Sequence, residues 1–232
     1  MCGRYCIAPK DASAWAPIGE VFGEAIAAQL GALQPQFNIA PSTQIPILVQ
    51  DARTRDFRAL VARWGLIPHW WRETKLPALS FNARSEEAAD RPMWKDAWRF
   101  TRCLIPATHW YEWRKQAATK QPFALSFADG NVFCFAGLYA WWRPAPDAEP
   151  RLSAAILTRA AAPSIADIHD RMPVILHANQ WRTWLDPDER DPARVRKILE
   201  VSAVLNAISW PVSLEVNSAL HQSAELLRPL SP

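Results

Sequence analysis

The most distinctive chemical group in this sequence is Cys2, which directly follows Met1. If Met1 is removed, Cys2 carries a thiol and a free α-amine on adjacent carbons. The amine has an ordinary pKa near 7.7–8.0 and the thiol near 8.5, so both are partly nucleophilic at neutral pH. Such a 1,2-aminothiol condenses with an aldehyde to a Schiff base, and the thiolate then closes a thiazolidine ring. A cysteine also follows Met by chance, so this chemistry is one of two interpretations.

Two further residues have side chains suited to proton transfer. Glu112 is framed by aromatic residues in Trp110-Tyr111-Glu112-Trp113, and apolar surroundings favour a raised carboxyl pKa. His169 lies in a dense run of titratable groups before an apolar stretch, and histidine exchanges protons near pH 7. Each residue also has an alternative interpretation. Glu112 can pair with a neighbouring Arg or Lys on a solvated face, and His169 can have a purely structural role.

The segment 82–86, Asn-Ala-Arg-Ser-Glu, has two interpretations. Asn82 can cap a helix that starts there, or the segment can present an amide and a guanidinium group to a ligand. Metal and nucleotide chemistry have no motif: the four Cys show no CxxC spacing, the five His are scattered, and P-loop, GxGxxG and GxSxG patterns are absent. We therefore expect reduced thiols, no metal and no cofactor.

The elements that would position these residues alternate along the chain. Apolar residues at three-to-four spacing predict a helix over 11–33, followed by a loop over 34–41 and by strands at 45–50 and 57–64. The aromatic, Pro-broken segment 65–71 is expected to be an exposed loop, and a short helix begins at Met93. Further strands are predicted at 102–105, 110–114, 123–127, 132–142 and 152–158, with Asp129-Gly130 marking a hairpin, and helices at 179–185 and 191–203.

This order predicts an α+β fold: one domain over residues 1–232, with a mainly antiparallel, barrel-like β-sheet flanked by helices. The composition is that of a globular protein, at 50% hydrophobic and 21% charged residues. The net charge of +3 is only mildly basic, but 20 of the 26 basic residues are Arg, which favours an anionic partner unless a GC-rich genome explains it. Without a membrane span or signal peptide, we expect a cytoplasmic, monomeric protein.

Seven segments in order resemble the SOS response-associated peptidase (SRAP) family, and the resemblance covers nearly the whole chain. The segments are Met1-Cys2-Gly3-Arg4-Tyr5, Phe37-Asn38-Ile39-Ala40-Pro41, Trp64-Gly65-Leu66-Ile67-Pro68, Asn82-Ala83-Arg84-Ser85-Glu86, residues 102–113, Phe135-Ala136-Gly137-Leu138 and Ile168-His169-Asp170-Arg171-Met172-Pro173. The resemblance implies removal of Met1 by the protein itself. Cys2 would then form a thiazolidine crosslink to the aldehyde of an abasic site in single-stranded DNA, shielding the lesion.

The resemblance also implies roles for individual residues. Glu112 would assist Met1 removal and deprotonate or position the Cys2 amine, His169 would act as acid and base in sugar opening and Schiff-base reversal, and Asn82 would hydrogen-bond the sugar or the adduct. Five residues would contact DNA: Arg4 and Arg84 at phosphates, and Pro41, Trp70 and Trp71 along the groove.

One departure from the family pattern precedes Glu112, where Ala107-Thr108-His109 replaces a small Asp-Gly-type turn. We expect His109 to add a side chain near Glu112. Two alternatives to the crosslinking function stay open: an N-terminal-nucleophile peptidase or amidohydrolase acting in trans, and a non-covalent module for single-stranded DNA. The Schiff-base stage would also permit lyase cleavage by β-elimination.

Overall fold

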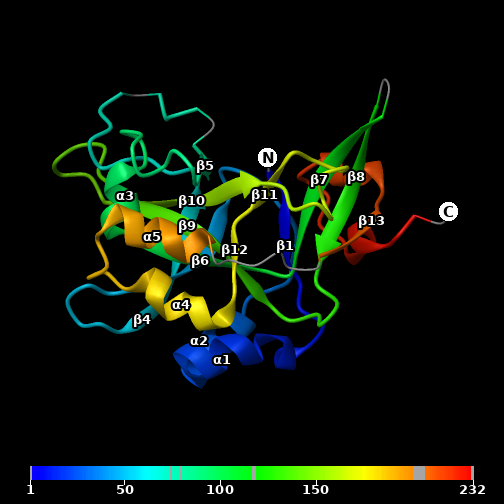
Figure 1. The fold of residues 1–232 in the computed structure, drawn as a ribbon, viewed down its shortest axis with the longest axis horizontal. Coiled ribbons are helices and arrows are strands. Elements are labelled where there is room, and N and C mark those ends of the chain that lie inside the picture. The colour runs from blue at the N-terminus through cyan, green and yellow to red at the C-terminus, as the bar shows by residue number, and fades with distance from the viewer. Residues whose placement is uncertain (1, 74, 79, 117–118, 201–206, 231–232) are drawn as a thin grey trace.

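Two β-sheets lie side by side in the computed structural model, with the N-terminal end of the chain between them (Figure 1). The structure describes residues 2–73, 75–78, 80–116, 119–200 and 207–230. The strands are β1 (Tyr5–Ile7), β2 (Gln36–Ile39), β3 (Gln44–Gln50), β4 (Phe57–Trp64), β5 (Asn82–Arg84), β6 (Arg102–Ala107), β7 (His109–Gln116), β8 (Thr119–Ser126), β9 (Phe133–Trp142), β10 (Arg151–Ala160), β11 (Arg171–Pro173), β12 (Ile175–Leu176) and β13 (Ile208–Pro211). The helices are η1 (Ala12–Trp15), α1 (Ala16–Phe22), α2 (Glu24–Gly31), α3 (Lys95–Phe100), α4 (Ala178–Leu185), α5 (Pro192–Glu200), η2 (Leu214–Asn217) and η3 (Ala224–Leu227).

The larger sheet closes into a barrel. Its strands run in the order β10-β4-β3-β6-β9, and β9 pairs again with β10 over six residue pairs, from Arg151↔Trp142 to Ile156↔Gly137. Closure leaves these five strands without a free edge. Strand β6 is buried along its whole length, as expected for a strand inside such a barrel. The predicted mainly antiparallel, barrel-like α+β fold is confirmed.

The second sheet has the order β13-β8-β7-β1-β2 and carries both the N-terminal strand and Glu112. Tyr5 of β1 joins it to the barrel, because its ring packs edge-on against Trp64 at 5.3 Å and against Phe135 at 5.6 Å. Such edge-to-face contacts are a preferred aromatic geometry. The start of the chain is therefore fixed at the junction of the two sheets.

The predicted helix over 11–33 is three shorter helices, η1, α1 and α2. Gly23 interrupts it with a backbone φ of 96°, a left-handed value that glycine adopts without steric cost. The buried face is as predicted, since Trp15, Ile18, Phe22 and Leu30 all lie in the core. The predicted apolar periodicity was right, and the break was missed because Gly23 occupies a solvent-facing position in the helical pattern.

Three other predictions need correction. The segment 34–41 contains strand β2 rather than only a loop, and Asn82 starts strand β5 rather than a helix. Asp129-Gly130 does form a turn, but β8 pairs with β7 and β13 while β9 pairs with β6, β10 and β12. The turn therefore sends the chain from one sheet to the other, and no hairpin forms there. The remaining predicted strands and helices are confirmed, except that 201–203 lie outside the described residues.

Candidate active site

Cys2 lies at the junction of the two sheets. Its side chain is fully buried, and its carbonyl oxygen accepts a 2.7 Å hydrogen bond from the amide Nδ2 of Asn82. The Cys2 Sγ is 3.8 Å from the carbonyl oxygen of Arg4, a long thiol hydrogen bond. Burial raises the pKa of the Cys2 thiol well above its usual value, so the resting sulfur is neutral.

Asn82 reaches Cys2 from the barrel. Strand β5 lies parallel to β10, with Asn82 beside Ile156 and Arg84 beside Thr158. The Asn82 side chain is 9% exposed, and its Oδ1 accepts no hydrogen bond from the described part of the chain. Buried polar atoms are nearly always hydrogen-bonded, so an open acceptor at this position indicates a donor supplied by a ligand or by the reacting groups.

Glu112 and His169 face one another beside Cys2. The His169 Nε2 is 3.9 Å from the Glu112 Oε2, and the Glu112 side chain is 1% exposed. Burial raises the pKa of Glu112 to about 7, which places its proton exchange at neutral pH. The negative charge of Glu112 adds to the effect of burial on the Cys2 thiol, raising its pKa further. The carboxylate and the thiol are therefore close enough to interact.

The ring of His169 is oriented by its own loop. The backbone N–H of Arg171 donates to His169 Nδ1 at 2.9 Å, and the Asp170 carboxylate lies 2.9 Å from the same nitrogen. Burial lowers the pKa of His169, which favours the neutral ring. In the neutral tautomer that accepts the Arg171 N–H, the proton is on Nε2, the nitrogen that faces Glu112.

A two-pronged ion pair holds the His169 loop against the Asn82 segment. Arg171 donates to both carboxylate oxygens of Glu86 at 2.8 and 2.9 Å, and to the carbonyl oxygen of Thr158 at 2.8 Å. Paired guanidinium–carboxylate bonds fix orientation as well as distance. Arg171 was not among the predicted site residues, although its place in the segment 168–173 was a usable signal.

Glu112 and His169 border an open groove of about 680 Å³. It is lined by Phe81, Glu112, Trp113, Lys115, Thr119, Lys120, His169, Leu214 and Asn217. Glu112 and His169 therefore belong to a cavity that a ligand can enter from solvent. The other lining residues could not be predicted from the sequence, because four of them come from the β7–β8 hairpin and two from η2, elements brought together only by the fold.

The two arginines expected at phosphates take different positions. Arg84 follows Asn82 by two residues on β5, hence on the same face, and is exposed with a long 3.7 Å contact to Glu87. Arg4 is half-buried and donates to the carbonyl oxygens of Gly3 at 3.0 Å and Asn217 at 3.3 Å. Arg84 is thus presented to solvent beside the site, whereas Arg4 braces the groove wall at Asn217.

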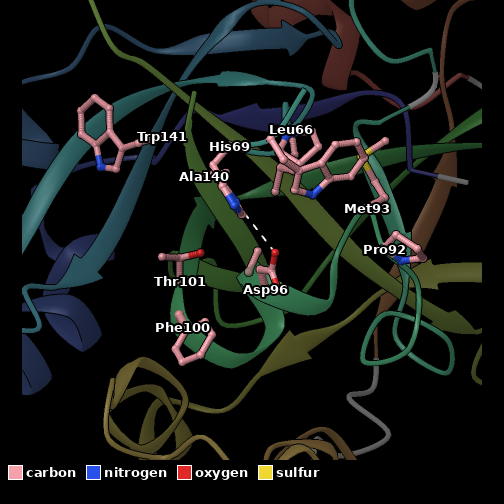
Figure 2. A pocket seen from close by; sticks show the side chains of 12 residues that line it. Leu66, His69, Pro92, Met93, Asp96, Phe100, Thr101, Ala140 and Trp141 are labelled. Atoms are coloured by element: carbon pink, nitrogen blue, oxygen red, sulfur yellow. Dashed lines mark ion pairs between the residues drawn. The ribbon is translucent and has the colours of Figure 1, made fainter. Parts of the chain in front are cut away.

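Pro41, Trp70 and Trp71 do not line the groove among the described residues. Trp70 lines a separate apolar cavity of about 480 Å³ beside α3, where Figure 2 shows His69 pointing to Asp96, 3.9 Å away. Trp71 is half-buried and packs against Trp70, with ring centroids 5.9 Å apart. The predicted loop over 65–71 exists, but only its end is exposed, because Leu66 and Ile67 are in the core.

His109 does not approach Glu112. It stands three positions earlier on the same strand, on the opposite face, since strand side chains alternate. Its ring packs edge-on against Trp210 at 5.8 Å, and Nδ1 lies 2.9 Å from the Thr108 hydroxyl. Burial lowers the pKa of His109 to about 4, so it stays neutral at physiological pH. The expectation of a side chain added beside Glu112 is wrong.

Two negative findings concern the described residues only. None of their helices is long and apolar enough to cross a membrane, and they contain no group of three or more His, Cys, Asp or Glu side chains arranged to hold a metal ion.

Comparison with known proteins identifies the family. Residues 1–219 match the family "SOS response associated peptidase (SRAP)". The chain is 34% identical over 228 residues to the abasic site processing protein YoqW of Bacillus subtilis, covering 98% of this chain and 99% of YoqW. It is 33% identical over 201 residues to the abasic site processing protein YedK of Escherichia coli, covering 84% and 85% of the two chains. A crystal structure of a Bacteroides thetaiotaomicron protein shares the fold with a TM-score of 0.80, at 22% identity over 99% of this chain and all of that one. The chain belongs to the SOS response associated peptidase family.

Proposed function

We propose that this protein captures abasic sites in single-stranded DNA by forming a covalent thiazolidine at Cys2. The observation that carries the proposal is the buried Cys2, held at its carbonyl oxygen by Asn82 and within electrostatic reach of Glu112. The names of relatives such as YoqW and YedK, both abasic site processing proteins, support the choice of substrate. A DNA substrate would place the protein in the cytoplasm with the nucleoid.

Removal of Met1 is the first step, because it frees the α-amine of Cys2. Hydrolysis of the peptide bond consumes one water and releases methionine. A carboxyl with a pKa of about 7 can accept a proton from the attacking water and return it to the leaving amine. We assign this role to Glu112, which is the carboxylate that interacts with Cys2.

The order of the next steps follows from the two pKa values. The Cys2 thiol is protonated at rest, whereas an α-amine with an ordinary pKa near 8 is partly neutral, so the amine attacks the aldehyde carbon first. Loss of one water gives the Schiff base. The sulfur then adds to the imine carbon as its proton passes to the imine nitrogen, with Glu112 as carrier. The net reaction joins aldehyde and aminothiol with loss of one water.

His169 and Asn82 would act on the sugar. An abasic sugar rests mostly as a closed hemiacetal, and opening it requires a proton to leave the hydroxyl and another to reach the ring oxygen. His169 presents Nε2 to the groove side of Glu112 and can exchange that proton. The open Oδ1 of Asn82 can accept a hydrogen bond from the sugar or from the Cys2 amine.

The site favours this reaction over hydrolysis of proteins in trans. We infer that a folded polypeptide would not reach the fully buried Cys2, which argues against hydrolysis in trans. The Schiff-base stage would also permit β-elimination, so the proposal includes a minor lyase activity that cleaves the DNA strand.

The test uses purified protein and a single-stranded oligonucleotide with one abasic site. We expect an adduct of protein without Met1 plus oligonucleotide minus one water in the intact mass spectrum, and no such adduct with Cys2→Ala. A protein with an uncleavable residue before Cys2 should also fail, because its α-amine is an amide. A heat-stable adduct from either variant would overturn the proposal.

A further inference from the structure

The hairpin of β7 and β8 places two lysines opposite one another at the groove. Lys115 and Lys120 are cross-strand partners in the register of this pair, both are exposed, and both line the groove that holds Glu112 and His169. Like charges directly opposite across two strands destabilise the pairing. The free protein therefore carries two like charges opposite one another beside its reactive groups.

Nothing in the described chain neutralises this pair. No carboxylate of the described residues forms an ion pair with Lys115 or Lys120, whereas the adjacent Arg114 lies 3.6 Å from Asp167 and 4.5 Å above the Phe123 ring. The cation that directly precedes Lys115 is thus partnered, whereas neither Lys115 nor Lys120 is ion-paired to a described carboxylate. This contrast indicates an anion that enters the groove.

We propose that Lys115 and Lys120 together bind one backbone phosphate of the DNA strand next to the abasic nucleotide. The inference rests on the proposed function and adds to it the path of the DNA strand across the protein. Lys115 and Lys120 line the same groove as Glu112 and His169, so the phosphate belongs to a nucleotide close to the reacting sugar.

The surroundings fit a nucleotide. Trp113 lines the same groove, and its indole Nε1 donates to Asn217 Oδ1 at 2.7 Å, which fixes the ring plane beside the lysines. An aromatic face next to paired cations is the arrangement that binds single-stranded nucleic acid. The charge of Lys115 also acts on His169, since it contributes to the lowering of the His169 pKa. Lys115 and His169 therefore interact electrostatically across the groove.

The test is equilibrium binding at several salt concentrations. The probe is a single-stranded oligonucleotide with a tetrahydrofuran abasic analogue, which lacks the aldehyde and cannot crosslink. Lys115→Gln/Lys120→Gln should weaken binding by roughly tenfold and reduce the slope of log K against log salt by about 0.7, the value for one phosphate on a single strand. Lys95→Gln, an exposed lysine on α3, is the matched control and should change neither quantity.

Methylphosphonates then locate the phosphate. Each phosphate near the analogue is replaced in turn by a neutral methylphosphonate. At one position the replacement should weaken binding to the wild type. At that same position it should not weaken binding to the double lysine variant any further. The inference would be overturned by any of three results: the double lysine variant has the affinity and salt slope of Lys95→Gln, its losses add to those of the methylphosphonate at every position, or the wild type does not bind the DNA. Adduct formation with a natural abasic site is measured separately. A normal adduct with an unchanged salt slope would refute phosphate binding by the two lysines and leave the crosslinking proposal intact. A lysine-dependent salt slope without any adduct would refute only the crosslinking proposal.

Discussion

Glu112→Gln should stabilise the folded protein increasingly as the pH rises. The carboxyl is 1% exposed, and burial raises its pKa from 4.5 to about 7. The folded state therefore keeps the Glu112 proton between these values while the unfolded chain has released it. The stabilising effect of the protonated carboxyl is complete below pH 4.5 and is lost as the pH rises through about 7.

The size of the effect follows from the same values. The gap between 4.5 and about 7, at about 1.4 kcal/mol for each pH unit, costs the ionised wild type about 3 kcal/mol above pH 7. Glutamine keeps the shape and cannot ionise, so it avoids this cost. For a chain of this length, 1 kcal/mol changes the melting temperature by about 2–4 °C. The melting temperature of Glu112→Gln relative to wild type should therefore rise by about 5–10 °C between pH 5 and pH 8.

The assay is thermal unfolding followed by circular dichroism at half-unit steps of pH. Glu20→Gln, on the exposed face of α1, is the control and should follow the wild type at every pH. The same Glu112→Gln protein should form adducts far more slowly, because it has lost the proton carrier. A difference in melting temperature that stays constant from pH 5 to pH 8 would show that Glu112 holds no proton at neutral pH, and its assigned role would fail.

Four further substitutions test other parts of the account. Asn82→Ala removes the 2.7 Å hydrogen bond to the Cys2 carbonyl and should slow adduct formation by tenfold or more, measured as crosslinked band against time; a wild-type rate would remove Asn82 from the site. His169→Ala should slow adduct formation more than it weakens binding to the tetrahydrofuran analogue, and equal losses would argue for a structural role. Arg84→Ala should reduce the salt slope of binding by about 0.7, and an unchanged slope would mean that Arg84 contacts no phosphate. Gly137→Ala should lower stability by about 1–3 kcal/mol, because a Cβ there would lie 2.8 Å from Cys103 Sγ and 2.9 Å from Ile105 Cδ1; an unchanged melting temperature would show that the barrel has room at this point.

Local pattern predicted the elements of this fold better than their connections. The alternating runs that became β3, β4, β6 and β10 carry their signal within a few residues, and the structure confirms them. Asp129-Gly130 marks a real turn, yet the strands beside it join different sheets. The partner of a strand is decided by which face it can bury, and that depends on residues far away in the sequence.

The candidate site likewise contains residues that could be predicted from the sequence and residues that could not. The structure brings together the four residues of the predicted catalytic set, Cys2, Asn82, Glu112 and His169, through contacts and charge effects from four separate segments. It keeps Trp70 in a different cavity and turns His109 to the opposite face of β7. Lys115 and Lys120 gave no signal in the sequence, since isolated surface lysines are common. Their meaning appears only in the register of the hairpin.

The central claim is that both reactive groups of Cys2 are consumed in one ring. The most direct measurement is digestion of the protein–DNA adduct, followed by tandem mass spectrometry of the N-terminal peptide after treatment with a thiol reagent and a reagent specific for primary amines. We expect a sugar remnant on Cys2 with one water lost, and no labelling of either its sulfur or its α-nitrogen. A labelled Cys2 thiol, or a remnant on any other residue, would contradict it.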